Sequence, residues 1–436
     1  MKKRIRGISR RLLPALAWLI PAMFFLTAAS AFAAGQGNEK TPAGLEKLIR
    51  EALANNPGLK AAREKFDAYS QRPSQAESWD NPRLGFGIRS LPVNTFSFDQ
   101  EPMTEKQVTV VQTIPFPGKL PLKGKIAGKD ADIAGEEAAE YKDNLISQVK
   151  TVYWDLLLID KTIDITRENR DLLRDFVKTA ESRYAVGKGI QQDVLKARVE
   201  LSRMIDALIS ERQEKESLTA RMNALLYRPL DVPVTETRGK DLDTLKLPPF
   251  AFRAGQLEQM ADEASPAFAG ARRQIEKYRL AVRLAKKDYY PDFDAAVSYG
   301  ERDFMPDLVS GSVLVSIPLW HKTKEDKRVA EERANVIMAE DRYNSLKNDT
   351  FLRLKDSVLR LGQYDNQIDL FKTGLIPQAR AALQSAIAAY SVNKVDFVTL
   401  INNQLALYNY EIEYYRLLAG YENIIAGIEA AVGRRF

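Results

Sequence analysis

The chain has 436 residues, of which 45% are hydrophobic and 28% are charged, and its 64 basic and 58 acidic residues give a formal net charge of +6. This composition favours folded domains over disorder, and the absence of cysteine excludes disulfides, thiolate metal sites and a lipid on an N-terminal cysteine. With His321 as its one histidine and no Gly-x-Ser-x-Gly elbow, the chain lacks the residues for a two-histidine zinc site or a serine hydrolase, so we do not expect an enzyme.

Residues 1–33 have the pattern of a secretory signal peptide. Six basic residues fall within the first eleven, an apolar run follows from Leu12 to Leu26, and small residues stand at Ala31 and Ala33. The run is short for a membrane span, although an uncleaved anchor is the alternative. Removing these six residues leaves as many basic as acidic ones, so the net charge does not indicate a nucleic-acid partner. We expect an exported chain, without a lipid tether, that starts near Ala34.

The remaining chain contains landmarks that recur at a spacing of roughly 203 to 209 residues. Each landmark is a short motif at an expected element boundary, and the pairs are Asn56-Pro57 with Ser265-Pro266, Pro82 with Pro291, Ile114-Pro115 with Ile317-Pro318, and Tyr184 with Tyr390. The pattern predicts two repeats, residues 34–250 and 251–436. Each repeat would contain a helix, a β-hairpin, a long helix, a corner and a returning helix.

The expected hairpins alternate apolar and small or polar residues over about nine residues a strand, the length that crosses a bilayer in a tilted barrel. The runs are 84–88, 108–114, 293–299 and 309–317, and aromatic residues stand near their ends at Trp79, Tyr289, Tyr290, Phe304 and Trp320. Half-buried strands of soluble proteins alternate too, so this pattern alone is a weak signal. Four strands cannot close a barrel, and lipid does not tolerate an open sheet edge, so strands that cross a membrane would require several copies. Three copies would supply twelve strands.

The expected helices are unusually long. No proline occurs between Pro121 and Pro229, which allows one helix from Leu122 to Tyr184, on the order of 95 Å. Apolar residues spaced alternately four and three apart from Leu145 onwards form a coiled-coil seam, for which an ordinary helical hairpin is the simplest interpretation. Pro377 predicts an interruption of the second long helix.

The strand-ending run Ile114-Pro115-Phe116-Pro117-Gly118-Lys119, the corner Tyr184-Ala185-Val186-Gly187 and the two-repeat plan resemble the TolC family of outer membrane factors from about Thr41 to Gly433. The run from Ile114, followed by Leu122 and Lys123, is most similar to the cation-efflux, CusC/CzcC-like members that partner resistance-nodulation-division (RND) pumps. By itself the run also suits a plain strand-to-helix turn, in which Lys119 has no evident capping role.

The resemblance implies a mainly α fold with a membrane β-barrel portion: a homotrimer with a twelve-stranded barrel in the outer membrane, continued by an α-helical barrel in the periplasm. It implies a passive exit duct, without cofactor or bound metal, that docks to a periplasmic adaptor and an inner-membrane RND transporter. Heavy-metal cations are one possible cargo. The alternatives are a soluble periplasmic coiled-coil scaffold and a type I secretion exit duct.

The resemblance also places function at the helix corners. Gate or lumen positions would be Asp193, Asp396, Thr399 and Asn402, and adaptor-docking positions would be Tyr184, Gly187, Tyr390 and Asn393. Asp193 follows Tyr184 by nine residues, whereas the matching position after Tyr390 is Thr399, so the second corner lacks that acid. Asp193 could equally be an exposed acid favoured by its helix dipole. Gly187 suits a helix end because glycine tolerates left-handed geometry.

Overall fold

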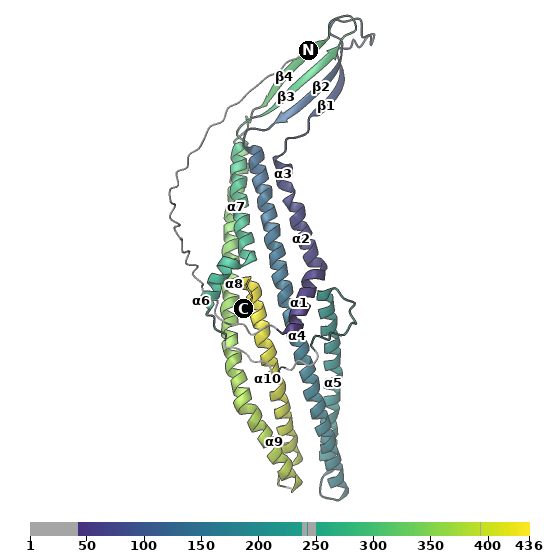
Figure 1. Cartoon of the computed structure of the whole chain (residues 1–436), viewed down its shortest axis with the longest axis vertical. Coiled ribbons are helices and arrows are strands. Elements are labelled where there is room, and N and C mark those ends of the chain that lie inside the picture. Colours follow the sequence, from purple (N-terminus) through teal and green to yellow (C-terminus); the bar gives the residue numbers. More distant parts are fainter. Residues whose placement is uncertain (1–41, 238–241, 243–249, 393) are drawn as a thin grey trace, which may run out of the picture. The chain divides into compact units, whose positions relative to one another are not determined.

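The computed structural model describes residues 42–237, 242, 250–392 and 394–436. The predicted signal peptide and Asn393 lie outside the described residues. Thr41–Phe436 form one compact unit of long helices and one small sheet (Figure 1). In chain order the elements are α1 (Ala43–Asn55), α2 (Pro57–Ser70), α3 (Arg72–Glu77), β1 (Arg83–Arg89), β2 (Glu105–Ile114), α4 (Lys119–Ala185), α5 (Gln191–Leu226), α6 (Ala254–Ala264), α7 (Pro266–Lys287), β3 (Asp292–Glu301), β4 (Leu308–Ser316), α8 (Glu325–Leu370), α9 (Ile376–Ser391) and α10 (Phe397–Val432).

Helix α4 confirms the long helix expected from the sequence and, with 67 residues, exceeds the predicted bounds at both ends. Pro121 lies in its first turn, where a missing backbone N–H removes no helical hydrogen bond. The apolar seam is buried at most positions, namely Leu145, Val149, Val152, Leu156, Ile163, Leu173, Val177 and Ala180. The seam packs against α5 and α10, so most of the helix is stabilised by tertiary contacts.

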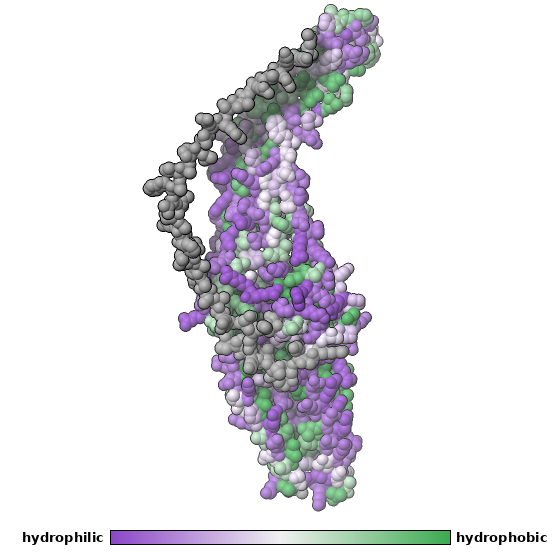
Figure 2. All heavy atoms as spheres, viewed as in Figure 1, coloured by the Kyte–Doolittle hydropathy of each residue, from purple (hydrophilic) through white to green (hydrophobic). Residues whose placement is uncertain are grey.

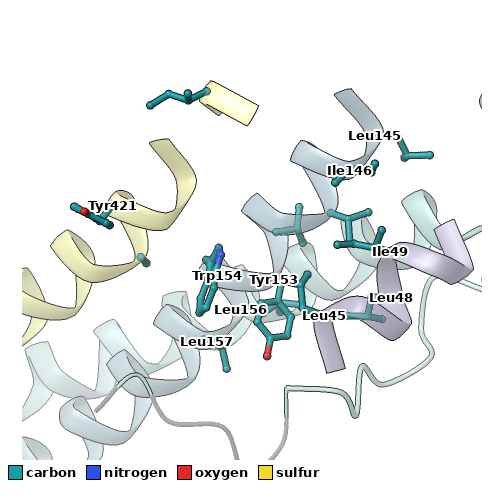
Figure 3. Packing of buried hydrophobic residues seen from close by; sticks show 14 of the residues in the cluster. Leu45, Leu48, Ile49, Leu145, Ile146, Tyr153, Trp154, Leu156, Leu157 and Tyr421 are labelled. Carbon is teal, nitrogen blue, oxygen red and sulfur yellow. The ribbon is translucent and has the colours of Figure 1, made fainter. Parts of the chain in front are cut away.

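Two apolar clusters hold the helices together. The larger joins α1 to the middle of α4, where Leu45 and Leu48 pack beside Tyr153 and Leu156, and it extends to α10 through Tyr421 (Figure 3). The smaller, which we call the corner cluster, joins the ends of α4 and α9 to the starts of α5 and α10; its buried members are Leu173, Phe176, Val177, Ala180, Val194, Ala197, Met204, Leu383, Ala386, Tyr390, Phe397, Leu400 and Ile401. Each fully buried Leu or Ile contributes about 1.5–3 kcal/mol, so both clusters stabilise the chain substantially.

The predicted interruption at Pro377 is confirmed. Helix α8 ends at Leu370, and a π-helical turn, Phe371–Leu375, precedes α9. The N–H of Ile376 bonds to the carbonyl of Phe371, five residues back. Because proline has no N–H and crowds the preceding turn, the wider π turn accommodates Pro377 without ending the rod.

The four strands form one antiparallel sheet in the order β1-β2-β3-β4, which confirms both expected hairpins. The hairpins are joined by pairing of β2 with β3, from Lys106 opposite Glu301 to Ile114 opposite Phe293. A sheet of this order leaves β1 and β4 as its outer strands.

Lys119 has a structural role that the sequence did not indicate. Its side chain is 8% exposed, and its Nζ lies 2.9 Å from the Oδ1 of Asp292 and 3.6 Å from the Oδ1 of Asp288. Asp292 also accepts a hydrogen bond of 2.6 Å from the backbone N–H of Phe116. This ion-paired cluster ties the β2–α4 connection to the α7–β3 connection.

No helix of the described residues is both long enough and apolar enough to span a membrane.

Candidate functional site

The two helix corners lie side by side (Figure 1). Arg183, in the last turn of α4, reaches across to the end of α9, where its Nη1 donates a 2.5 Å hydrogen bond to the carbonyl of Tyr390. The guanidinium carbon also lies 4.3 Å from the centroid of the Tyr390 ring. A hydrogen bond and a cation–π contact from one side chain therefore link the two corners.

Gly187 ends α4 in the left-handed geometry expected of it, with φ of 69°. Its N–H bonds to the carbonyl of Tyr184 at 3.0 Å, and the N–H of Lys188 bonds to the carbonyl of Arg183 at 2.8 Å. These bonds satisfy carbonyls that the helix end would otherwise leave unpaired. The corner is therefore a compact turn that a residue with a side chain would strain.

The two tyrosines that match in sequence differ in environment. Tyr184 is 50% exposed, whereas Tyr390 is 6% exposed and packs 5.5 Å from the Phe397 ring. Burial raises the pKa of Tyr390, since a phenolate would be poorly solvated, although Arg183 acts in the opposite direction. Within the described residues the Tyr390 hydroxyl has no hydrogen-bond partner. Tyr390 is thus part of the corner cluster, and Tyr184 is part of the surface.

Asp193 lies in the first turn of α5 and is partly buried. Burial raises its pKa; nearby Arg183 lowers it, and the negative charge of Asp396 raises it further. The structure therefore brings Asp193, Arg183 and Asp396, from three helix ends, into one electrostatic group.

At the second corner the acidic residue is Asp396. This residue caps α10, accepting a 2.8 Å hydrogen bond from the backbone N–H of Thr399. That hydrogen bonding lowers the pKa of Asp396. Thr399 and Asn402 are exposed on the first turns of α10.

Arg183 is the functional candidate that the sequence reasoning missed. The available signal was a basic residue in the last turn of a long helix, where a positive charge interacts favourably with the negative end of the helix dipole. Its partner Tyr390 is 207 residues away in sequence, so spacing alone could not reveal the contact.

The sheet presents one continuous apolar face. Directly opposite residues share a face, so the registers place the following side chains together: Leu84, Phe86 and Ile88 of β1, Val108 and Val110 of β2, Val297 and Tyr299 of β3, and Val309, Val313 and Val315 of β4. Every one of them is exposed, from 37% at Val108 to 77% at Phe86. The hydropathy surface shows hydrophobic side chains over the sheet and near the corners (Figure 2). Exposed apolar side chains gathered on one face, unlike single scattered ones, mark a surface that contacts another protein or lipid.

The opposite face of the sheet is mostly small or polar. It carries Gly85, Thr109, Ser298, Ser310 and Ser312, interrupted by a few apolar residues such as Leu314. The two faces of the sheet therefore differ in polarity, one apolar and the other mostly small or polar.

Among the described residues no group of three or more His, Asp or Glu side chains is arranged to hold a metal ion.

The chain is similar in sequence and in fold to known outer membrane proteins. Residues 48–226 match the family model described as outer membrane efflux protein. The chain is 23% identical over 401 residues, covering 90% of both chains, to the cobalt-zinc-cadmium resistance protein CzcC of Cupriavidus metallidurans. Its fold is shared with the outer membrane protein VceC of Vibrio cholerae, with TM-score 0.75, 17% identity and coverage of 90% of this chain and 97% of that one. It is shared also with CusC, with TM-score 0.73, 15% identity and coverage of 90% and 92%.

Proposed function

Because the chain belongs to the outer membrane efflux protein family, we propose that it is the outer membrane exit duct of a tripartite efflux system. In this role it passively conducts substrates, handed over by a periplasmic adaptor and an inner-membrane RND pump, to the exterior. The chain itself catalyses no reaction.

The single observation that supports this proposal most strongly is the exposed apolar face of the sheet. Exposing side chains such as Phe86, Val309 and Val313 to water costs about 25 cal/mol for each Å² of their apolar surface. Facing lipid, the same side chains are stabilised, while the polar face lines an aqueous lumen. This face argues against the soluble periplasmic scaffold.

The outer strands β1 and β4 support a trimer. A sheet edge cannot remain open in hydrocarbon, so each β4 must pair with β1 of another copy until the barrel closes. Three copies give twelve strands, a closed size with room for an aqueous lumen. The same symmetry assembles the long helices of residues 34–250 and 251–436, the two proposed repeats, into a periplasmic tube.

The helix corners form the periplasmic mouth in this proposal. Asp193 and Asp396 supply its negative charge, and Thr399 and Asn402 line the path beside them. Tyr184, Gly187, Tyr390 and Asn393 are the proposed adaptor-docking positions, of which Tyr184 is half exposed and Tyr390 is buried. The exposure favours Tyr184 for direct contact with the adaptor, and the burial favours Tyr390 for holding the corner in shape.

Heavy-metal cations are the cargo that the comparison favours, since the CzcC relative is a cobalt-zinc-cadmium resistance protein. That likeness is also the observation that favours efflux over type I protein secretion. The duct is not expected to bind the cation tightly, because the pump that feeds it selects the cargo.

Membrane fractionation followed by sizing tests the proposal. The duct is expected in the outer membrane, soluble only with detergent, and with the mass of three chains. Recovery as a monomer or dimer without detergent would instead support the soluble scaffold.

A further inference from the structure

Near the corners, the helices of one chain lie in an open row. Helix α4 packs against α5 and against α10, and α10 packs in turn against α9, so among the described residues α5 and α9 are the outer members of the row. The row follows the order of the strands (Figure 1), because α4 continues from β2, and α8 with α9 continues from β4. Helix α5 thus lies beyond α4, just as β1 lies beyond β2.

Helix α5 carries an apolar stripe, which we call the α5 stripe, on the side that faces away from its own chain. At about 100° for each residue, four large apolar side chains fall within an arc of about 120° opposite to the buried Met204. They are Leu195, Val199, Ile205 and Ile209, and each is between 44% and 63% exposed. Ser202 and Asp206 share the arc, and so does Arg198, whose guanidinium bonds to its own corner. A stripe of this width normally faces a packing partner.

The outward side of α9 is uncharged, although it is exposed. Arg380 is the one charged residue of this helix, and its guanidinium bonds to Glu411 of α10 at 2.8 Å. Opposite to the buried Tyr390, the helix exposes mostly small side chains, which are Pro377, Ala381, Ser385 and Ala388. The solvent side of a helix normally carries charged residues, so this side is better suited to contact with another helix. Its small side chains allow the two helix axes to approach closely.

The two surfaces lie at similar distances from the corners. The α5 stripe starts about 6 Å from the first residue of α5 and extends for about 21 Å along the helix. The uncharged side of α9 starts about 5 Å from the last residue of α9 and extends for about 17 Å. Because the corners lie side by side, copies related by a threefold axis along the helices would hold both surfaces at one level.

We propose that the α5 stripe of one copy packs against the uncharged side of α9 of the next copy, so that apolar contact closes each helical joint of the trimer. This inference rests on the proposed trimeric duct and names the surface that closes its helical part. The order of the elements favours a second copy over an adaptor as the partner. Pairing of β4 with the next β1 brings α9 of one copy and α5 of the next to the same joint. With this contact, every helix of the row has a neighbour on both sides.

Cross-linking tests the contact directly, because the chain has no cysteine. Val199→Cys with Ala388→Cys, and Ile209→Cys with Ala381→Cys, should each give covalent dimers and trimers on a denaturing gel after treatment with a short bismaleimide. As a matched control, Lys178→Cys with Ala388→Cys should give neither, since Lys178 is exposed on α4, inside the row. A sized trimer that cross-links at neither test pair would overturn the inference and leave the duct intact. A cysteine-free chain that never sizes as a trimer would overturn the proposed function itself.

Overpacking and labelling provide two further readouts on the detergent-solubilised trimer. Ala388→Phe adds a ring to the joint and should speed dissociation of the trimer about tenfold, because a packed contact does not accommodate the extra volume. Lys178→Phe, the same ring on α4, should change the rate by less than about twofold; equal rates would overturn the inference. Val199→Cys should react with a polar maleimide at least about tenfold more slowly than Lys178→Cys. Equal labelling of the two cysteines would leave the α5 stripe open to another partner, such as the adaptor, and would also overturn the inference.

Discussion

The helices of this chain bury a core of their own, whereas the sheet buries very little. Along α4 the seam residues Leu156 and Leu173 are at most 2% exposed, but every residue of β4 is exposed. The helical part therefore has a core within one copy, although apolar side chains such as Leu195, Ile209 and Leu352 remain exposed, while the sheet has almost no core of its own. The sheet is the region in which solvent and assembly determine stability.

The largest effect is expected from a charge on the apolar face of the sheet. Val313→Arg should abolish assembly in the outer membrane, because arginine at the middle of the bilayer costs about 2–4 kcal/mol and a trimer repeats that cost in every copy. Ser312→Arg, one residue earlier and on the polar face, should assemble normally. Outer-membrane yield and heat-resistant trimer on gels are the measurements. Equal loss for both variants would remove the distinction between the two faces.

The second effect concerns the helical core. Leu156→Ala should lower the free energy of unfolding by about 2–5 kcal/mol, through lost burial and the cavity left behind. Lys178→Ala, at an exposed ion pair, should change it by less than about 0.5 kcal/mol. Chemical denaturation followed by helical circular dichroism measures both. If Leu156→Ala left the free energy of unfolding almost unchanged, the stability of the helices, like that of the sheet, would depend mainly on partners.

A smaller effect is expected where sheet and helices connect. Lys119→Met should destabilise the chain by about 1–3 kcal/mol, because it leaves Asp288 and Asp292 without their shared cation. Lys65→Met removes an exposed pair with Glu137 and should cost no more than about 1 kcal/mol. The same denaturation experiment compares them. Equal costs would show that the buried cluster at Lys119 is no stronger than a surface pair.

At the corners, the expected change is in how often the periplasmic mouth of the channel is open. Arg183→Gln removes the contact between corners and should raise the ratio of open to closed channels about tenfold, equivalent to ~1.4 kcal/mol from a charged hydrogen bond. Arg198→Gln should not, since Arg198 bonds to Glu181 within a single corner. Single-channel recording in planar bilayers distinguishes them. Identical open probabilities would exclude Arg183 as a link that holds the mouth closed.

The smallest effect is expected on the way the stability of the folded corners depends on pH. Burial raises the pKa of Asp193 above its usual value of 3.8, so ionisation weakens the folded corner as the pH rises through the raised pKa. Asp396 has the opposite sign: its pKa is lowered, so its cap is present above pH 3.8 and is lost as the pH falls through the lowered pKa. Asp193→Asn should therefore remove a mild loss of corner stability above pH 3.8, and Asp396→Asn should not. Amide hydrogen exchange at α5 and α10 across pH would detect this, and matching profiles for both variants would contradict it.

Periodic features were predictable from the sequence. The alternation of Val309, Val313 and Val315 predicted strand β4, and the four-three spacing from Leu145 predicted the buried side of α4. Both signals repeat along one element and therefore need no knowledge of distant contacts.

Contacts between distant segments were not predictable. Lys119 meets Asp292, and Arg183 meets Tyr390, across more than 170 residues of chain in each case. The difference between Tyr184 and Tyr390 has the same origin, since only packing of the two corners buries one and exposes the other. For the corners, the sequence therefore indicated Tyr390 but neither Arg183 nor the contact between the two residues.

The most direct test of the account asks what touches the sheet. Because the chain has no cysteine, single cysteines can be placed along β4 from Val309 to Val315, given a fluorescent label and reconstituted in liposomes containing brominated lipid. Quenching should be strong at 309, 313 and 315 and weak at 310, 312 and 314. Uniform quenching, or none at any position, would contradict the claim that one face of this sheet meets lipid and the other meets water.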